Sequence, residues 1–281
     1  MELSELDPDG WVRAGKQMQE LVRKVKSNGL PLADYVNNRV YYGIKTGCHK
    51  AFVIDARVRD LLIAEDARSA EIIKPFLIGK DIKRYITPES DQYIIFTRRG
   101  VDINQYPAIQ EYLQQYKQQL EPRPLDWKGA GWKGRKPGPY QWYEVQDTIL
   151  YWEEFEKPKI LWPEIASSAR FTFDDAGYYA NNKIYIIPEG SKYLLGLLNS
   201  SLLKLFIHSI CTDLQGSSFN FSEAFLKRVP IRKIDLSDAT DKSRHDQMVE
   251  LVERMLELSK QLQTAKTSHD KTTLERQINA T

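Results

Sequence analysis

The sequence predicts an α+β fold, in which a mixed, largely antiparallel sheet domain is followed by a helical, coiled-coil-like spacer. Three observations predict it. Short strand-like runs recur along most of the chain, segments with helical spacing of apolar residues lie between them, and a heptad pattern occupies the C-terminal region. We expect a helical lead-in over 1–30, one domain over 31–236 and a helical spacer over 237–281.

The N-terminal elements follow from apolar spacing and from turn residues. Residues 16–26 place apolar side chains at helical intervals, and Ser27-Asn28-Gly29 ends this helix. Two strand-like runs lie within 39–55, with Gly43 and Gly47 between them, so we expect a β-hairpin there. Residues 57–74 are predicted to form a helix that stops before Pro75.

The central elements alternate between strands and helices. A strand is expected at 93–96, and a helix at 107–120. Further strands are expected at 159–162, 171–173 and 183–187, followed by an apolar helix at 191–208 and a Gly/Ser loop at 215–220.

Residues 121–143 differ from everything around them. They are rich in Pro, Gly, Lys, Arg and Trp and show no periodicity, so a long loop is predicted. Long loops without secondary structure inside a compact domain tend to be functional or disordered.

The C-terminal region shows a seam of apolar residues. Leu251, Met255, Leu258 and Leu262 recur at spacings of four and three, as in paired helices. Thr272-x-x-Glu275 resembles a capping box for a second helix whose apolar stripe is cut off at the end of the chain, so a fragment of a longer polypeptide is expected. Pairing of the two helices is the default, while contact with another domain or a second copy remains open.

Bulk composition bounds the class of protein. The 281 residues suffice for one large domain or for one domain with an appendage, and 42% hydrophobic residues allow a substantial core. The sequence has no apolar run of about 18 residues and no secretory signal pattern, and its two cysteines lie far apart, so a reducing cytoplasm is expected. A net charge of +2 is too small to identify a nucleic-acid binder, so the distribution of charge must decide.

Several motifs of common enzymes are absent. The sequence has no phosphate-binding G-x-x-x-x-G-K-[ST] loop, no glycine-rich start of a dinucleotide or methyl-donor fold, no G-x-S-x-G and no H-E-x-x-H. We therefore expect no catalysis on this chain, although a metal-dependent nuclease needs only a few scattered carboxylates and a lysine.

Six short segments, in order, carry a family resemblance. These are 43–47 with 50–54, then 73–82, 106–109, 157–160, 198–200 and 251–256. From about residue 30 to the end, the chain resembles the specificity (target-recognition) region of type IIG restriction–modification enzymes and adenine-specific DNA methyltransferases. One departure is Cys48-His49, where the family usually has a small polar residue before Lys-Ala-Phe.

The resemblance implies a function. Residues 31–236 are expected to recognise a specific sequence in double-stranded DNA and to direct an adenine-N6 methyltransferase or restriction endonuclease to it. The catalytic part would lie elsewhere in the same chain or in a partner, and it would use S-adenosylmethionine and Mg²⁺. No cofactor, metal or membrane is expected for this chain, and the prokaryotic cytoplasm is the expected location.

The best candidate for the DNA surface is the long loop. Its cations and rings are expected to meet phosphates and guanine edges; the alternative is a solvated basic loop whose tryptophans pin it to the core. The candidates in this loop are Arg123, Trp127, Lys128, Lys133, Arg135 and Lys136.

Three further groups are weaker candidates, each with a structural alternative. Lys45, Thr46 and Lys50 flank a glycine turn that would suit a phosphate or serve geometry alone. Lys80, Lys83 and Arg84 form a basic cluster that is otherwise a solvated face. Ser217, Ser218 and Asn220 suit DNA contacts or a plain connection.

Other interpretations remain open. The chain could be a Mg²⁺-dependent DNA endonuclease in its own right, or a protein-interaction module that uses its C-terminal helices. A zinc site from Cys48, His49, His208 and Cys211 is disfavoured, because adjacent ligands suit one metal poorly and His208 lies on an apolar helix.

Overall fold

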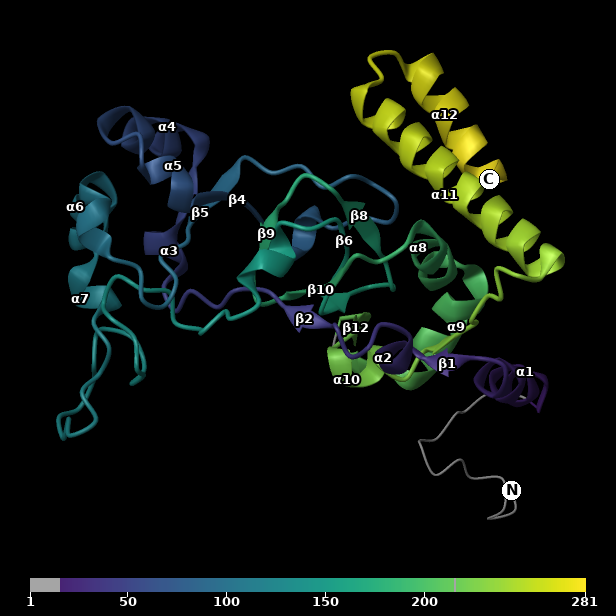
Figure 1. Cartoon of the computed structure of the whole chain (residues 1–281), viewed down its shortest axis with the longest axis horizontal. Coiled ribbons are helices and arrows are strands. Elements are labelled where there is room, and N and C mark those ends of the chain that lie inside the picture. Colours follow the sequence, from purple (N-terminus) through teal and green to yellow (C-terminus); the bar gives the residue numbers. More distant parts are fainter. Residues whose placement is uncertain (1–15, 215) are drawn as a thin grey trace.

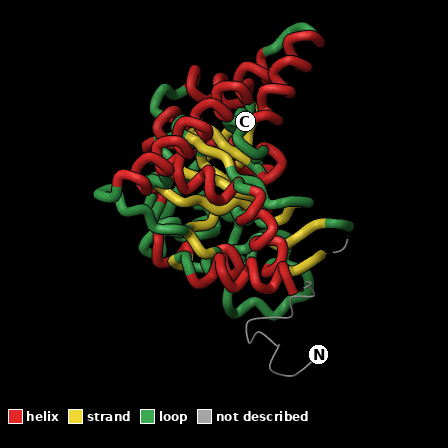
Figure 2. The backbone as a smooth tube through the Cα atoms, turned by 90° about the vertical axis from the view of Figure 1, so that its right-hand side faces the viewer, coloured by secondary structure: helices red, strands yellow, loops and turns green. Residues whose placement is uncertain are grey.

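The structure, a computed structural model, describes residues 16–214 and 216–281. Its sheets lie between a group of helices at one end and a long helical hairpin at the other (Figure 1). In the perpendicular view the central strands run through the interior with helices outside them, while a pair of strands projects at the right-hand edge (Figure 2). The N-terminal part of the expected lead-in falls outside the described residues.

The helices are short except near the C-terminus. They are α1 (Lys16–Ser27), α2 (Leu32–Tyr35), α3 (His49–Phe52), α4 (Ala56–Glu65), α5 (Ser69–Ile72), α6 (Pro107–Gln114), α7 (Lys117–Leu120), α8 (Lys192–Asn199), α9 (Ser201–Ile210), α10 (Glu223–Leu226), α11 (Ala239–Thr264) and α12 (Ser268–Ala280). The described residues also include the 3₁₀ turns η2 (Gly79–Asp81), η3 (Ile103–Gln105) and η4 (Trp152–Phe155).

The strands are also short. They are β1 (Leu30–Pro31), β2 (Tyr41–Tyr42), β3 (Val53–Asp55), β4 (Ile73–Leu77), β5 (Gln92–Ile95), β6 (Lys159–Pro163), β7 (Ile165–Ala166), β8 (Thr172–Asp174), β9 (Tyr179–Ala180), β10 (Ile184–Pro188), β11 (Thr212–Leu214), β12 (Ser218–Asn220) and β13 (Pro230–Ile231).

Strand pairing confirms the mixed, largely antiparallel architecture. One four-stranded sheet has the order β2-β10-β6-β8, and all its pairs are antiparallel. A second has the order β3-β5-β4-β9, in which β4 and β9 are parallel. Smaller sheets are β11-β12-β7 and β1-β13. The expected α+β class is thus confirmed.

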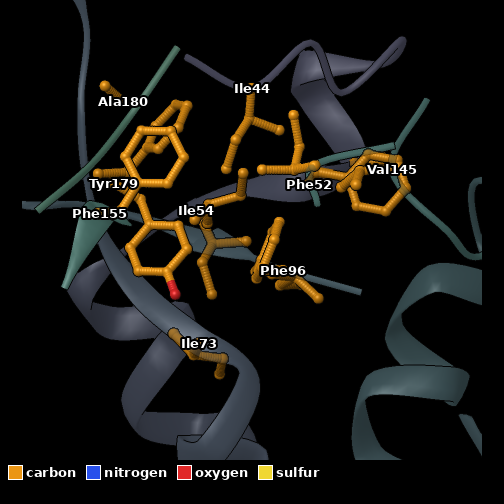
Figure 3. Packing of buried hydrophobic residues seen from close by; sticks show 14 of the residues in the cluster. Ile44, Phe52, Ile54, Ile73, Phe96, Val145, Phe155, Tyr179 and Ala180 are labelled. Carbon is orange, nitrogen blue, oxygen red and sulfur yellow. The ribbon is translucent and has the colours of Figure 1, made fainter. Parts of the chain in front are cut away.

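Two apolar cores lie on opposite faces of the central strands. Along β6, Leu161 belongs to the first core, while Ile160 and Trp162 belong to the second; along β10, Ile186 and Ile187 divide in the same way. Alternation of side chains along a strand produces this division. Figure 3 shows part of the first core, which the second four-stranded sheet closes from the other side.

The β-hairpin expected over 39–55 is wrong. β2 pairs with β10 and β3 pairs with β5, so the two runs belong to different sheets, and α3 lies between them. Gly43 does not form a hairpin turn; it allows the backbone at Asn181 to pass close by, because a Cβ at Gly43 would lie 2.0 Å from the Asn181 carbonyl oxygen. Gly47 does need glycine, since its φ is +77°.

Other boundaries also differ from expectation, and the helices expected over 57–74 and 107–120 are each divided in two, as α4 and α5 and as α6 and α7. The helix expected up to residue 74 ends as α5 at Ile72, and the chain continues as strand β4 through Pro75. The apolar helix at 191–208 is two helices, because Ser200 caps α9 by accepting a hydrogen bond from the Leu203 amide at 3.2 Å. Within the segment expected to be a loop at 215–220, residues 218–220 form β12.

The C-terminal helices pack together and onto the domain. α11 lies along α8, where Gly196 leaves space for α11: a Cβ there would come within 2.6 Å of Met248 Sδ. α12 folds back along α11, which confirms the expected pairing, but it starts after Thr267 rather than at Thr272.

Within the described residues no single helix is both long and apolar enough to cross a membrane; only α8 and α9 taken together, bent by 65°, meet that standard by length and composition.

Candidate nucleic-acid interface

The segment between α7 and η4 contains no helix or strand among the described residues, as expected for 121–143. It leaves the end of α7 and projects from the body of the molecule (Figure 1). Its conformation is nevertheless fixed, because buried polar groups at its base bind the backbone on both sides.

Arg135 is the main fastening of this segment. Its guanidinium donates to the carbonyl oxygens of Leu120 (2.7 Å), Thr46 (3.1 Å), Glu144 (2.7 Å), Gln141 (3.1 Å) and Trp142 (2.9 Å). The same group lies over the Tyr140 ring, 4.4 Å from its centroid. A planar, five-donor group suits such a set of carbonyls, and lysine does not.

This placement corrects one expected contact. Arg135 is 4% exposed, so it offers no free surface to a phosphate. Burial lowers the pKa of Arg135 to about 10, which still leaves it charged at neutral pH. Its role here is to hold the loop rather than to touch DNA.

A second fastening joins the returning end of the loop to the turn that follows β5. Arg99 Nη1 lies 2.8 Å from Glu144 Oε2, and this carboxylate also accepts from the backbone N–H groups of Gly100 (2.7 Å) and Gln141 (2.8 Å). Arg99 also donates to the Gln146 carbonyl oxygen at 3.1 Å. Glu144 is buried at 3% exposure, and these donors compensate its charge.

The tryptophans stiffen the outer part of the loop. Trp127 and Trp132 meet edge to face, with ring centroids 5.0 Å apart. Trp132 Nε1 donates to the Glu121 carbonyl oxygen at 3.0 Å. Gly134 makes this approach possible, since a Cβ there would lie 2.2 Å from the same oxygen. Trp127 itself remains 44% exposed.

The remaining cations of the loop point to solvent. Arg123, Lys128, Lys133 and Lys136 are exposed, and none of them forms an ion pair with a carboxylate of the described residues. The loop is therefore a fixed support that presents unneutralised positive charge.

The segment 43–50 lies against the same base. The Asp147 and Gln146 amides donate to the carbonyl oxygens of Lys45 and Thr46, both at 3.2 Å. Lys45 is exposed, as is Lys50, whose ammonium lies 5.9 Å from the Tyr116 ring centroid. The Thr46 side chain is 8% exposed, so within this group only the two lysines are open to a ligand.

Two of the three cations at 80–84 have other surroundings in the structure. Lys80 lines a cavity of about 530 Å³ together with Asp81, Glu89 and Asp91, whose carboxylates would repel a phosphate. Arg84 donates to the Asn199 carbonyl oxygen at 2.8 Å, at the end of α8. Lys83 is exposed.

The third expected group lies on the β11–β12 hairpin. Ser217 is exposed at a positive φ of 57°, next to Gly216. Ser218 and Asn220 are half-buried, and Asn220 Oδ1 accepts from the Ser222 amide at 2.9 Å. Asn220 therefore already has a local role.

The cysteines and histidines considered for zinc are separated. Cys48 packs against the first core, while Cys211 packs against the second, where the His208 ring meets the rings of Phe219 and Phe221 edge to face. Among the described residues no three His, Cys, Asp or Glu side chains are grouped to hold a metal ion.

Sequence reasoning missed two features of the interface. The first is the ion pair Arg99–Glu144, for which the sequence offered one indication: Glu144 is the acidic residue at which the cationic run ends. Leu125, the most exposed large apolar residue described at 93% exposure, was not singled out.

The comparisons with known proteins agree on one family. The model of the TaqI-like C-terminal specificity domain matches residues 74–231, more than half of the chain. The chain is 23% identical over 227 residues to the Type II methyltransferase M.BstVI of Geobacillus stearothermophilus, covering 78% of this chain and 37% of that protein. It is 25% identical over 228 residues to the Type II methyltransferase M.PaeR7I of Pseudomonas aeruginosa, covering 79% and 37%.

Two solved structures share the fold. The Type IIL restriction-modification enzyme MmeI, in complex with DNA, has a TM-score of 0.57 at 13% identity, covering 86% of this chain and 31% of that one. The type IIG restriction endonuclease BpuSI has a TM-score of 0.51 at 14% identity, covering 93% and 32%.

The chain spans less than two fifths of the length of these curated relatives. The family model matches residues 74–231, which lie inside the region that resembles a specificity domain, from about residue 30 to the end. The expected resemblance to restriction–modification enzymes is confirmed. The chain belongs to the family of TaqI-like C-terminal specificity domains.

Proposed function

We propose that this chain recognises a specific sequence in double-stranded DNA, and that it directs an adenine-N6 methyltransferase, with or without endonuclease activity, to that sequence. Membership of a specificity-domain family supports DNA target recognition. The finer assignment to adenine rests on the resemblance of the six sequence segments.

One observation carries the proposal: four exposed cations without carboxylate partners among the described residues sit on a loop that Arg135 fastens. Duplex DNA carries one negative charge per about 1.7 Å of its axis, so a fixed cationic support gains phosphate contacts without first being ordered. Lys45 and Lys50 extend this surface, because their segment is bonded to the same base.

Phosphate contacts set the register of a protein on DNA, and base contacts specify sequence. Arg123 is the loop cation best suited to a guanine, because an exposed guanidinium can bond to its O6 and N7 together. The lysines supply charge alone.

Methyl transfer is assigned to a part of the protein outside these residues. The relatives named as Type II methyltransferases are more than twice as long as the matched region. The described residues contain no glycine-rich strand–turn–helix that would hold S-adenosylmethionine, so we place that cofactor, and any Mg²⁺, in the other part. We expect the protein to act in the cytoplasm of a prokaryote.

Selection from a random duplex pool tests the proposal. The 281-residue chain should enrich one short consensus, and the variant Lys128→Ala/Lys133→Ala should recover the same consensus with weaker binding. No enrichment by the wild-type chain at low salt would contradict sequence recognition.

A plasmid incubation separates the proposal from the nuclease alternative. The chain with Mg²⁺ should leave the plasmid intact. Cleavage that disappears when one carboxylate is substituted would assign the activity to this chain instead.

A further inference from the structure

The outermost turn of the loop presents an aliphatic side chain. Trp127 N–H donates to the Pro124 carbonyl oxygen at 3.2 Å, which closes a turn with Leu125 and Asp126 at its tip. Leu125 is 93% exposed. Single exposed leucines are common on protein surfaces, so its surroundings must decide what it does.

This turn is rigid. Pro124 has a fixed φ, Trp127 packs on Trp132, and Arg123 N–H donates to the Arg135 carbonyl oxygen at 3.0 Å. The turn is thus connected through short contacts to the buried guanidinium at the base of the loop. A side chain at its tip can enter a partner without the cost of ordering the backbone.

Charge around the tip shows how it would meet a duplex. Arg123 and Lys128 flank the turn, and both are exposed, while Asp126 occupies the tip next to Leu125. Phosphates attract the flanking cations and repel Asp126. The tip therefore fits between the two phosphate backbones, in a groove, with the cations against the strands on either side.

We propose that Leu125 is a wedge that inserts between adjacent base pairs of the bound DNA and partly unstacks them. This inference rests on the proposed DNA binding. Apolar side chains used in this way include leucine, and they kink the duplex at the step they enter. The deformable pyrimidine–purine steps are the expected point of entry.

The experiment uses short duplexes in which 2-aminopurine replaces the adenine of TpA steps, because its fluorescence rises when it unstacks. Wild-type 281-residue chain should raise the fluorescence on binding. Leu125→Ala should abolish the rise and weaken binding on the order of tenfold, since it removes a buried leucine contact. Its binding should keep the wild-type dependence on salt, because the cations are unchanged.

Two control variants accompany it. Leu125→Met should retain the rise, and Leu61→Ala, at a 61% exposed position on α4, should behave as wild type. Equal urea midpoints for Leu125→Ala and wild type establish that the fold is intact. Because methyl transfer is proposed to lie outside these 281 residues, and no S-adenosylmethionine is added, catalytic base flipping is not expected to contribute to the signal.

The outcomes are distinct. Wild-type binding without a fluorescence rise, or an equal rise with Leu125→Ala, overturns the wedge and leaves the proposed DNA recognition standing. Absence of any wild-type binding at low salt overturns both.

Discussion

Arg135 Nη1 donates to the carbonyl oxygen of Thr46 at 3.1 Å, although 89 residues separate the two in sequence. This bond joins the long cationic loop to the segment 43–50, which contains Gly43 and Gly47. Both segments were candidates for DNA contact from the sequence. The surface proposed to contact DNA is therefore held in place by a buried cation, Arg135, that does not itself contact DNA.

Arg135→Ala should lower the free energy of unfolding by about 3 kcal/mol, because five carbonyl oxygens lose a charged donor. The free energy of unfolding of Arg135→Lys should lie between those of Arg135→Ala and the wild type, because an ammonium keeps the charge but lacks the planar set of five donors. Urea denaturation measures both. Trypsin should cut Arg135→Ala faster at Lys128 and Lys133; unchanged cleavage and stability would show that the loop does not rely on this group.

Gly134→Ala should disturb the loop more than Gly131→Ala. A Cβ at Gly134 would lie 2.2 Å from the Glu121 carbonyl oxygen and 2.6 Å from Trp132 Nε1. A Cβ at Gly131 would meet no atom within 4 Å, so only the positive φ of +69° disfavours alanine there. That conformation should lower the free energy of unfolding by about 1 kcal/mol. Thermal unfolding of both variants checks this; equal losses would contradict the described packing.

The buried ion pair Lys159–Asp174 bridges β6 and β8, with 2.5 Å between Nζ and Oδ2 and no exposure of either side chain. Lys159→Met leaves Asp174 charged and buried, so it should cost about 3 to 5 kcal/mol. Lys183→Met breaks the solvent-facing pair with Glu164 and should cost under about 1 kcal/mol. Urea unfolding compares them, and similar costs would contradict the burial.

We expect His208 to make stability depend on pH. Its Nε2 accepts from the Ala169 amide at 3.2 Å, which requires the neutral ring, and burial lowers its pKa. A lowered pKa means that the unfolded chain binds the proton first, so stability is full above about pH 6.5 and falls as pH drops toward the folded pKa.

Urea unfolding across this pH range measures that loss. In His208→Gln the glutamine side-chain oxygen can still accept the hydrogen bond from the Ala169 amide, so the free energy of unfolding should depend less on pH. His49→Gln, at an exposed position, should keep the wild-type dependence of unfolding free energy on pH. Identical profiles for all three chains would exclude His208 as the source.

Local patterns predicted the regular elements well where burial was continuous. The apolar runs around Ile160 and Ile186 became the central strands, because both faces of these strands are covered by core. The hairpin at 39–55 failed for a non-local reason. β2 has only two residues, and its partner Tyr185 lies more than a hundred residues away, which no local pattern reveals.

The candidate site was predicted as a segment but not residue by residue. Composition alone marked 121–143, because clustered cations and rings persist in any conformation. Which cation is buried depends on which one the fold places among carbonyl oxygens, and the local sequence does not show that this is Arg135 rather than Arg123. Likewise, nothing local distinguishes Leu125 at a turn tip from a leucine in the core.

The salt dependence of duplex binding tests the central claim most directly. Each phosphate contact contributes about 0.9 to the slope of log K against log salt, so Arg123→Ala/Lys128→Ala/Lys133→Ala should reduce the slope by about 2 to 3. Lys266→Ala/Lys271→Ala/Arg276→Ala removes the same charge from exposed positions on the C-terminal helical hairpin and should leave it unchanged. Equal slopes for the two triple variants would contradict the assignment of the loop as the DNA-contacting surface.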